Sequence, residues 1–324
     1  MRRGLRSVRA LRSVRALRVF ALLSVIANCV IVVTGGAVRV TASGLGCPTW
    51  PSCTSDSLTP VAEYSWHGAV EFGNRMLTFV VVVVAIGTLV LAVAQRTERR
   101  LALLAFLGIP AQAVLGGITV LTGLNPYSVA SHFLLSMVLI AVTAVLHRRV
   151  RLATGLAPPV TAVPGPVRGL ARVTLVVAAL VLVVGTVVTG SGPHAGDEGA
   201  KHRMGFDPGG VSQLHADLVM VLVGLVVGLV VALRLTHAPS GAVKAGWWLL
   251  AAIGAQGVVG YTQYFLGVPA VLVVVHMAGA CAVWVAALTV PLQLTDHGRR
   301  EDVPASTTAP PARPVDRPLT PIAS

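Results

Sequence analysis

Eight apolar segments constrain this chain more than any other feature. Each is about 20 residues long, the length that a helix needs to cross the hydrocarbon core of a bilayer. The segments are 18–38, 69–94, 101–121, 129–147, 171–190, 212–234, 245–265 and 270–292. Lipid offers no partner for unpaired backbone groups, so all eight are predicted to be helices. The sequence therefore predicts an all-α membrane protein with eight transmembrane helices in the lipid bilayer.

The charged residues lie between these segments. Only 11% of the residues are charged, yet the formal net charge is +13. The arginine-rich stretches fall in the tails and in alternate connections, at 2–18, 95–100, 147–151, 234–244 and 297–302. Because they form no single soluble face, no nucleic-acid partner is expected. The positive-inside rule then places both termini and these connections in the cytoplasm, as in a multi-pass protein of the cell membrane.

The two ends of the chain are expected to differ from the helical part. The hexamer LRSVRA occurs twice, at 5–10 and 11–16, and makes a basic arm. A cleaved secretory signal is the competing interpretation, but the first apolar segment continues into TGGAVRV without a clear small-residue cleavage site. We therefore predict an uncleaved first helix with a surface-associated arm. From 303 onward the tail is rich in Pro, Ala and Thr and is predicted to be disordered.

An internal repeat organises the membrane part. IPAQAVLGGITVLTG at 109–123 resembles IGAQGVVGYTQYFLG at 253–267 with an offset of 144, and the same offset carries His132 onto His276. An even number of helices separates equivalent positions, so both copies have the same orientation. This predicts two tandem four-helix bundles related by a pseudo-twofold axis along the membrane normal. The expected divisions are a basic cytoplasmic arm at 1–17, an N-terminal half at 18–147, a cytoplasmic linker at 148–170, a C-terminal half at 171–292 and a disordered cytoplasmic tail at 293–324.

A second alignment brings polar side chains to the outer ends of the even-numbered helices. EFGNRMLTFVVV at 71–82 lies over SQLHADLVMVLV at 212–223, which pairs Asn74 with His215. His215 and His276 then share one depth in the second half, as expected for two axial ligands of a haem between helices. The alternative for each is a packed, hydrogen-bonded histidine.

In the first half, the equivalent pair is Asn74 and His132. Asparagine is a poor ligand for haem iron, so this half offers at most one strong axial ligand, His132. Such asymmetry is expected when one half keeps a saturated electron-transfer haem and the other presents a reactive one. The alternative is that the first site has decayed.

Glu71 lies one helical turn outside Asn74 on nearly the same face. A carboxylate at this depth is costly unless it is paired or used. It is a candidate acid, base or charge stabiliser, and the competing interpretation is a structural salt bridge to Arg75. Arg39 and Arg75 are candidate contacts for haem propionates, although Arg39 could equally snorkel to the interface.

The cysteines divide into two kinds. Cys47 and Cys53 lie in the first outward loop, which has too few further Cys or His residues for a zinc site. An oxidising outer face favours a disulfide between them, with a redox-active dithiol as the alternative. Cys29 and Cys281 lie inside helices and are predicted to be small core residues.

Other polar positions have weaker predictions. Gln112 and Gln256, with their neighbouring glycines, are predicted to make interhelical hydrogen bonds at close helix contacts. His67 is expected to be an interfacial surface residue. In the loop at 191–210 four side chains form a candidate polar lid: His194, Lys201, His202 and Arg203.

Taken together, these residues resemble the haem A synthase family of membrane enzymes. The resemblance covers about 20 to 292 and depends on GGAVRVTASGLGCPTWPSC at 35–53, the ExxxR element at 71–75 and the histidines at the outer helix ends. It implies an oxidoreductase that oxidises a methyl group of haem O to a formyl group, giving haem A for terminal oxidases. It also implies haem b as cofactor, bound by His215 and His276.

The resemblance places the substrate haem in the first half, with Glu71 at the position of the family's essential glutamate and His132 as a ligand. Many members have histidine where this chain has Asn74, so bis-histidine binding of the substrate does not carry over. Expected partners are haem O synthase and an electron-transfer protein. The rival interpretations are a non-catalytic haem-b electron carrier and a haem transfer or assembly protein.

Overall fold

In the part of the chain that it describes, the computed structural model has eight long helices. It describes the chain except for residues 1, 61–64, 156–162, 195, 197–201 and 295–324. The helices are α1 (Arg2–Val40), α2 (Ser65–Ala94), α3 (Arg99–Leu121), α4 (Pro126–Ala153), α5 (Gly165–Ser191), α6 (Pro208–Leu235), α7 (Ser240–Phe265) and α8 (Ala270–Leu294). All eight are long and apolar enough to cross a membrane, which confirms the predicted all-α class and the eight spans. The chain is therefore described as a multi-pass membrane protein.

The helix ends follow local sequence signals. Before α4, the Asn125 side chain accepts a hydrogen bond from the backbone N–H of Tyr127 at 3.0 Å, and Pro126 opens the helix. Before α6, the Asp207 carboxylate accepts from the N–H of Gly210 at 2.6 Å in the same way. α1 starts at Arg2, well before the apolar segment, so the basic arm continues the first helix.

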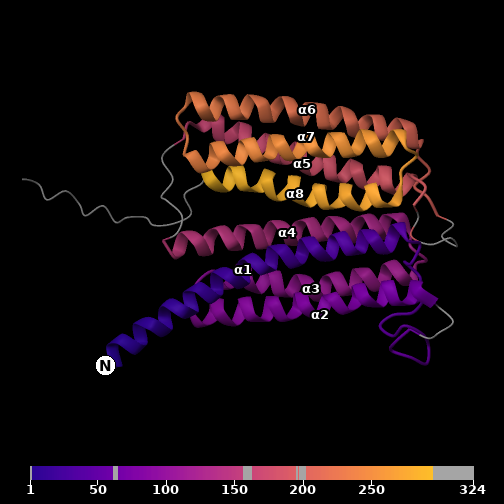
Figure 1. Ribbon diagram of the computed structural model, residues 1–324, viewed down its shortest axis with the longest axis horizontal. Helices are drawn as coiled ribbons and strands as arrows, with labels where there is room; N and C mark the ends of the chain where they lie inside the picture. The colour runs from indigo at the N-terminus through magenta and orange to yellow at the C-terminus, as the bar shows by residue number, and fades with distance from the viewer. Residues whose placement is uncertain (1, 61–64, 156–162, 195, 197–201, 295–324) are drawn as a thin grey trace, which may run out of the picture.

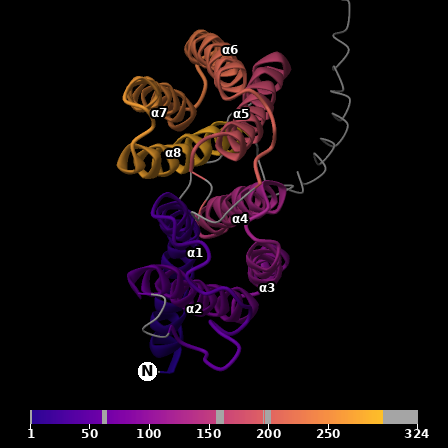
Figure 2. The same ribbon diagram turned by 90° about the vertical axis from the view of Figure 1, so that its right-hand side faces the viewer.

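The helices pack as two units of four, as Figures 1 and 2 show. In the first unit α1 contacts α2 and α4, and α3 contacts α2 and α4; in the second, α5 contacts α6 and α8, and α7 contacts α6 and α8. The same neighbours thus recur in both halves. Among the described residues, α2 does not contact α4 and α6 does not contact α8, so each of these pairs is diagonal within its unit. The pseudo-twofold relation itself remains a prediction.

The turns repeat as well as the helices. Gly123 and Leu124 both have positive φ where α3 meets α4, and Gly267 and Val268 do the same where α7 meets α8. These two pairs are separated by the offset of 144 that relates the two sequence copies. A non-glycine residue with positive φ is uncommon, so its recurrence at equivalent places supports the duplication.

The two units meet through α1, α4, α5 and α8. The Trp284 indole N–H donates to the carbonyl oxygen of Met137 at 2.9 Å, and the Arg148 guanidinium donates to the carbonyl oxygen of Leu292 at 3.2 Å. Both bonds join α4 to α8, and their donors are buried. The predicted domain divisions agree with this grouping but stay predictions, and the tail from residue 295 lies outside the described residues.

Candidate functional site

Each of the four polar positions singled out by the repeat faces a glycine of the preceding helix. A Cβ built on Gly116 of α3 would lie 3.2 Å from the His132 ring, and one on Gly260 of α7 would lie 3.4 Å from the ring of His276. The helix pairs α3–α4 and α7–α8 therefore hold their histidines in the same way. Glycine leaves room there for an imidazole against the neighbouring backbone.

The other two positions show the same arrangement. A Cβ on Gly185 of α5 would lie 3.2 Å from the His215 ring, whereas one on Gly35 of α1 would lie 4.0 Å from the amide nitrogen of Asn74. Asn74 thus occupies, in the first unit, the place that His215 occupies in the second. The structure supports the sequence alignment of these two residues.

The three histidine rings have unpaired nitrogens. Nδ1 of His132, His215 and His276 is buried and makes no hydrogen bond. A neutral imidazole has a donor and an acceptor, and leaving either unsatisfied in an apolar interior costs free energy. His215 and His276 project from the diagonal helices α6 and α8. Two rings on diagonal helices, each with an unpaired nitrogen, fit a haem that two histidines would bind.

Two glutamines support the helix turns that carry the histidines. The Gln112 side-chain amide donates to the carbonyl oxygen of His132 at 3.2 Å and to the Ser136 hydroxyl at 2.7 Å. Gln256 donates to the carbonyl oxygen of His276 at 2.8 Å. These bonds confirm the predicted interhelical contacts, and they fix the backbone from which each ring projects.

Asn74 is bound to α1 rather than to another residue of α2. The Thr34 hydroxyl donates to Oδ1 of Asn74 at 2.7 Å. That oxygen is therefore engaged, and the amide nitrogen is the group left beside Gly35. Sequence reasoning did not find Thr34, because a threonine in a membrane helix commonly bonds its own backbone, as this one also does with Val30 at 3.1 Å.

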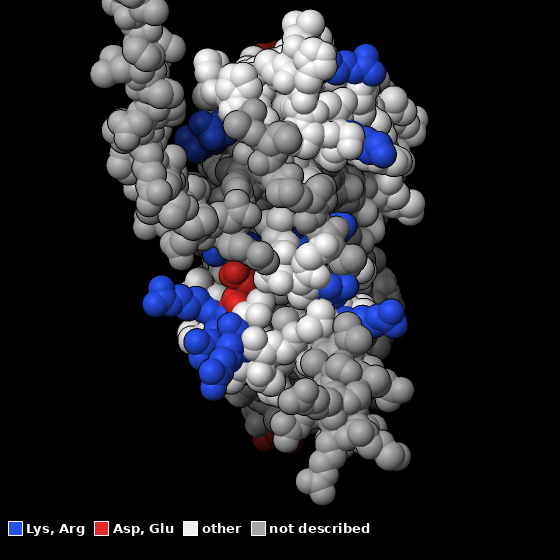
Figure 3. Space-filling model, turned by 90° about the vertical axis from the view of Figure 1, so that its left-hand side faces the viewer, with Lys and Arg blue, Asp and Glu red and all other residues white. Residues whose placement is uncertain are grey.

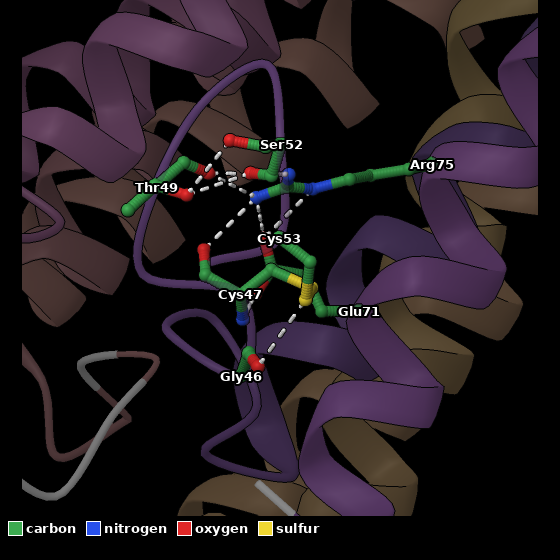
Figure 4. A network of polar contacts seen from close by, with 7 residues as sticks. All are labelled: Gly46, Cys47, Thr49, Ser52, Cys53, Glu71 and Arg75. Carbon is green, nitrogen blue, oxygen red and sulfur yellow. Dashed lines mark hydrogen bonds and ion pairs between the residues drawn. A yellow bond between two sulfur atoms is a disulfide. The ribbon is translucent and has the colours of Figure 1, made fainter. Parts of the chain in front are cut away.

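Glu71 and Arg75 form a salt bridge beside the loop that follows α1 (Figure 4). The Arg75 Nη2 lies 2.6 Å from Oε1 of Glu71, and the other carboxylate oxygen of Glu71 accepts the backbone N–H of Cys47. Arg75 also donates to the carbonyl oxygens of Cys47, Thr49 and Ser52 at 3.0–3.2 Å. The ion pair thus binds the loop to α2.

The loop is closed by a disulfide between Cys47 and Cys53, with a Cα–Cα distance of 4.3 Å. Both cysteines are fully buried. Trp50, between them, lies against Gly117 of α3, where a Cβ would come within 2.6 Å of the indole. Because Gly116 faces His132, the loop and the candidate ligand contact adjacent residues of one helix. The predicted disulfide is present.

Arg39 joins the two units at the ends where α1 and α5 finish. Its guanidinium donates to the carbonyl oxygen of His194 at 2.8 Å and to that of Thr189 at 3.1 Å. The His194 ring in turn contacts the carbonyl oxygen of Val268 at 2.8 Å. Gly44 donates to the carbonyl oxygen of Gly196 at 2.7 Å. This part of the predicted lid therefore connects the units.

The remaining predicted residues lie as follows. Arg203 bonds the carbonyl oxygens of Gly192 and Pro193 within its own loop, and Lys201 lies outside the described residues. His67 contacts the Ser43 hydroxyl at 3.0 Å. Arg39 and Arg75 both donate to protein carbonyls, and their predicted contact with haem propionates stays a prediction.

An apolar groove runs along the contact between α1, α7 and α8. Its volume is about 610 Å³, and a smaller cavity of about 260 Å³ continues it to Thr34. Cys29 and Cys281 line both. Cys281 is buried as predicted, whereas Cys29 is only half-buried.

Comparison with known proteins adds to this geometry. A model of the cytochrome oxidase assembly protein family matches residues 18–70 and 67–197, more than half of the chain. The chain belongs to this family. The match includes Glu71, Asn74, His132 and the disulfide loop, and it ends before α6.

Individual relatives cover less of the chain. A heme A synthase of Geobacillus thermodenitrificans is 32% identical over 112 residues, 33% of this chain and 34% of the relative. One of Geobacillus kaustophilus is 32% identical over 111 residues, 33% of this chain and 34% of the relative. One of Listeria welshimeri is 33% identical over 121 residues, 36% of this chain and 39% of the relative. The chain thus matches little more than a third of the length of these relatives.

Proposed function

We propose that this protein is a haem A synthase, which oxidises a methyl group of haem O to a formyl group. One observation carries the proposal: three histidines, each with a buried and unpaired Nδ1, occupy repeat-related positions inside two helical units. Family membership and the printed name of the relatives, heme A synthase, support it. The reaction removes four electrons from the methyl carbon and adds one oxygen atom, so it needs a redox partner as well as a substrate site.

The second unit is the proposed site of the cofactor, haem b. His215 and His276 would be its axial ligands, because both rings project from diagonal helices and keep an unpaired nitrogen. Two imidazoles saturate the iron, so a haem bound there supplies electron transfer. Gln256 supports this role by fixing the backbone of His276.

The first unit is the proposed substrate site, with His132 as the ligand of haem O. Glu71 lies one turn from Asn74 and is the proposed proton acceptor or charge stabiliser for oxidation of the methyl group. Its carboxylate already binds Arg75 and the loop, so it is held in one position. A fixed acceptor needs no reorganisation during the reaction.

We infer the orientation in the cell membrane from charge. The end of the molecule that carries the start of α1 is rich in Lys and Arg (Figure 3). Arg96, Arg99, Arg149, Arg168 and Arg234 lie at or near the helix ends there. Cytoplasmic connections carry an excess of such residues, which supports cytoplasmic termini and sites near the outer surface. A haem O synthase and an electron-transfer protein are the proposed partners.

Haem extraction tests the proposal directly. Cells that make haem O are compared with and without this protein, and the extracted haems are separated by chromatography. Haem A should appear only with the protein, and His132→Ala should abolish it. If haem b is bound but haem O remains unconverted in the presence of its partners, the protein is an electron carrier or a haem transfer protein, and the proposal is wrong.

A further inference from the structure

The first unit places one histidine ring at the depth of its candidate site. His132 projects from α4, and the equivalent place on the diagonal helix α2 holds Asn74. Three other described histidines lie near this end: His67 contacts Ser43 two turns further out, His194 contacts Val268, and His202 is exposed in the loop before α6. Within the described part of the first unit, His132 is therefore the one imidazole available to a haem at this depth.

The contacts of Asn74 determine which of its atoms faces the site. Oδ1 accepts the Thr34 hydroxyl at 2.7 Å, so the oxygen points to α1. Nδ2 has no hydrogen-bond partner among the described residues and lies beside Gly35. In the second unit, the equivalent glycine, Gly185, lies beside the His215 ring. A carboxamide nitrogen is a hydrogen-bond donor without a lone pair for iron. The side chain can therefore donate into the site but offers no axial ligand there.

We propose that Asn74 is a hydrogen-bond donor facing the open coordination position of a haem that His132 alone binds. The inference rests on the proposed function, and it specifies how the substrate is bound. A haem with one histidine ligand is high-spin and takes up small ligands at its free position, whereas a haem with two histidines is low-spin and does not. Thr34 is the positioning residue, because its hydroxyl fixes the orientation of the amide.

Spectroscopy on the full-length protein tests this arrangement without reference to turnover. The purified protein is loaded with haem O and examined by electron paramagnetic resonance and by carbon monoxide binding after reduction. We expect a low-spin, unreactive haem in the second unit and a high-spin, carbon monoxide-binding haem in the first. His132→Ala should remove the high-spin signal and keep the low-spin one.

Substitution of Asn74 separates its role from that of a mere space-filler. Asn74→His restores the second imidazole, so the first-unit haem should become low-spin and lose carbon monoxide binding. Asn74→Leu should keep both high-spin iron and carbon monoxide binding but shift the C–O stretching frequency, because the donor is lost. Thr34→Val should broaden the same band, because the amide is no longer fixed.

The outcomes distinguish this inference from the function on which it rests. A low-spin first-unit haem in the wild type, or a high-spin one in Asn74→His, overturns the proposed coordination. An unshifted C–O stretch in Asn74→Leu overturns the donor role. If the spectra are as expected but no haem A forms in cells, the coordination stands and the proposed function fails. If haem A forms while the wild-type spectrum is low-spin, the reverse holds.

Discussion

The two carboxylate oxygens of Glu71 bind different groups, and this bears on whether the role of Glu71 is structural or chemical. One oxygen accepts the backbone N–H of Cys47, and the other binds Arg75. Both interpretations of Glu71 from the sequence are thus compatible with the structure, because the predicted salt bridge to Arg75 is present. The ion pair is only partly exposed, so its loss should affect stability as well as chemistry.

Arg75→Ala and Glu71→Gln should therefore have different effects. Arg75→Ala removes bonds to three loop carbonyls and should lower stability by about 1–3 kcal/mol while leaving part of the haem conversion. Glu71→Gln keeps an oxygen for the Cys47 N–H but loses the charge, and it should abolish conversion with a smaller loss of stability. Thermal unfolding in detergent and haem chromatography measure the two effects. Equal conversion by Glu71→Gln and wild type would show that Glu71 is structural.

At the scale of elements, the positions of the glycines that face the histidines matter as much as the positions of the histidines themselves. Gly260 lies against the His276 ring, whereas a Cβ on Gly257, one turn earlier in α7, would meet nothing within 4 Å. Both glycines belong to the same helix and lie at similar depth. Substituting Gly260 and Gly257 in turn therefore separates the effect of filling the space beside the His276 ring from the effect of losing a glycine in α7.

Gly260→Leu should displace the His276 ring and remove the low-spin haem, because the new side chain occupies the space of the imidazole. Gly257→Leu should retain that haem, since its site is open. Absorbance of the bound haem relative to protein gives the measurement. Retention of a normal low-spin spectrum in Gly260→Leu would mean that His276 is not held against this glycine when haem is bound.

The disulfide loop is a second element whose contribution can be measured. Cys47→Ser combined with Cys53→Ser opens the loop and should lower stability by about 2–4 kcal/mol, because the unfolded chain gains conformational freedom. Thermal unfolding with and without reductant should show that the wild type under reduction resembles the double variant. A wild type that is insensitive to reductant, although its thiols then react with a probe, would contradict this expectation.

The sequence predicted the elements better than the contacts between them. The apolar segments located the helices, and the offset of 144 paired His132 with His276 and Gln112 with Gln256. Both succeeded because burial and duplication leave periodic patterns in a sequence. The bond between Thr34 and Asn74 left no such pattern. Gly35 and Gly185 are 150 residues apart rather than the 144 that relates His132 to His276, so the repeat alone did not pair them.

At the scale of the whole molecule, the uneven charge makes the orientation testable. Ser55 and Ser240 are both exposed serines, and they lie at opposite ends of the helices. In intact cells, a membrane-impermeant maleimide should label Ser55→Cys, whereas Ser240→Cys should react only after permeabilisation. Native thiols interfere little, because Cys47 and Cys53 are paired, Cys281 is buried, and the half-buried Cys29 lies in the apolar middle of α1. The opposite labelling pattern would invert the proposed topology.

Several loop carbonyls converge on Arg75, and this affects the directions from which a molecule could approach the first unit. Lifting the loop from α2 would remove the carbonyl acceptors of the Arg75 guanidinium and the Cys47 N–H that Glu71 accepts, although the ion pair itself lies within α2 and would remain. Opening of the loop therefore breaks several hydrogen bonds at once, so we expect the loop to stay closed over this end of the first unit. The groove that reaches Thr34 faces apolar surroundings and carries no such penalty. We expect an apolar molecule in the bilayer to enter this groove between α1 and α8 without breaking any of these bonds.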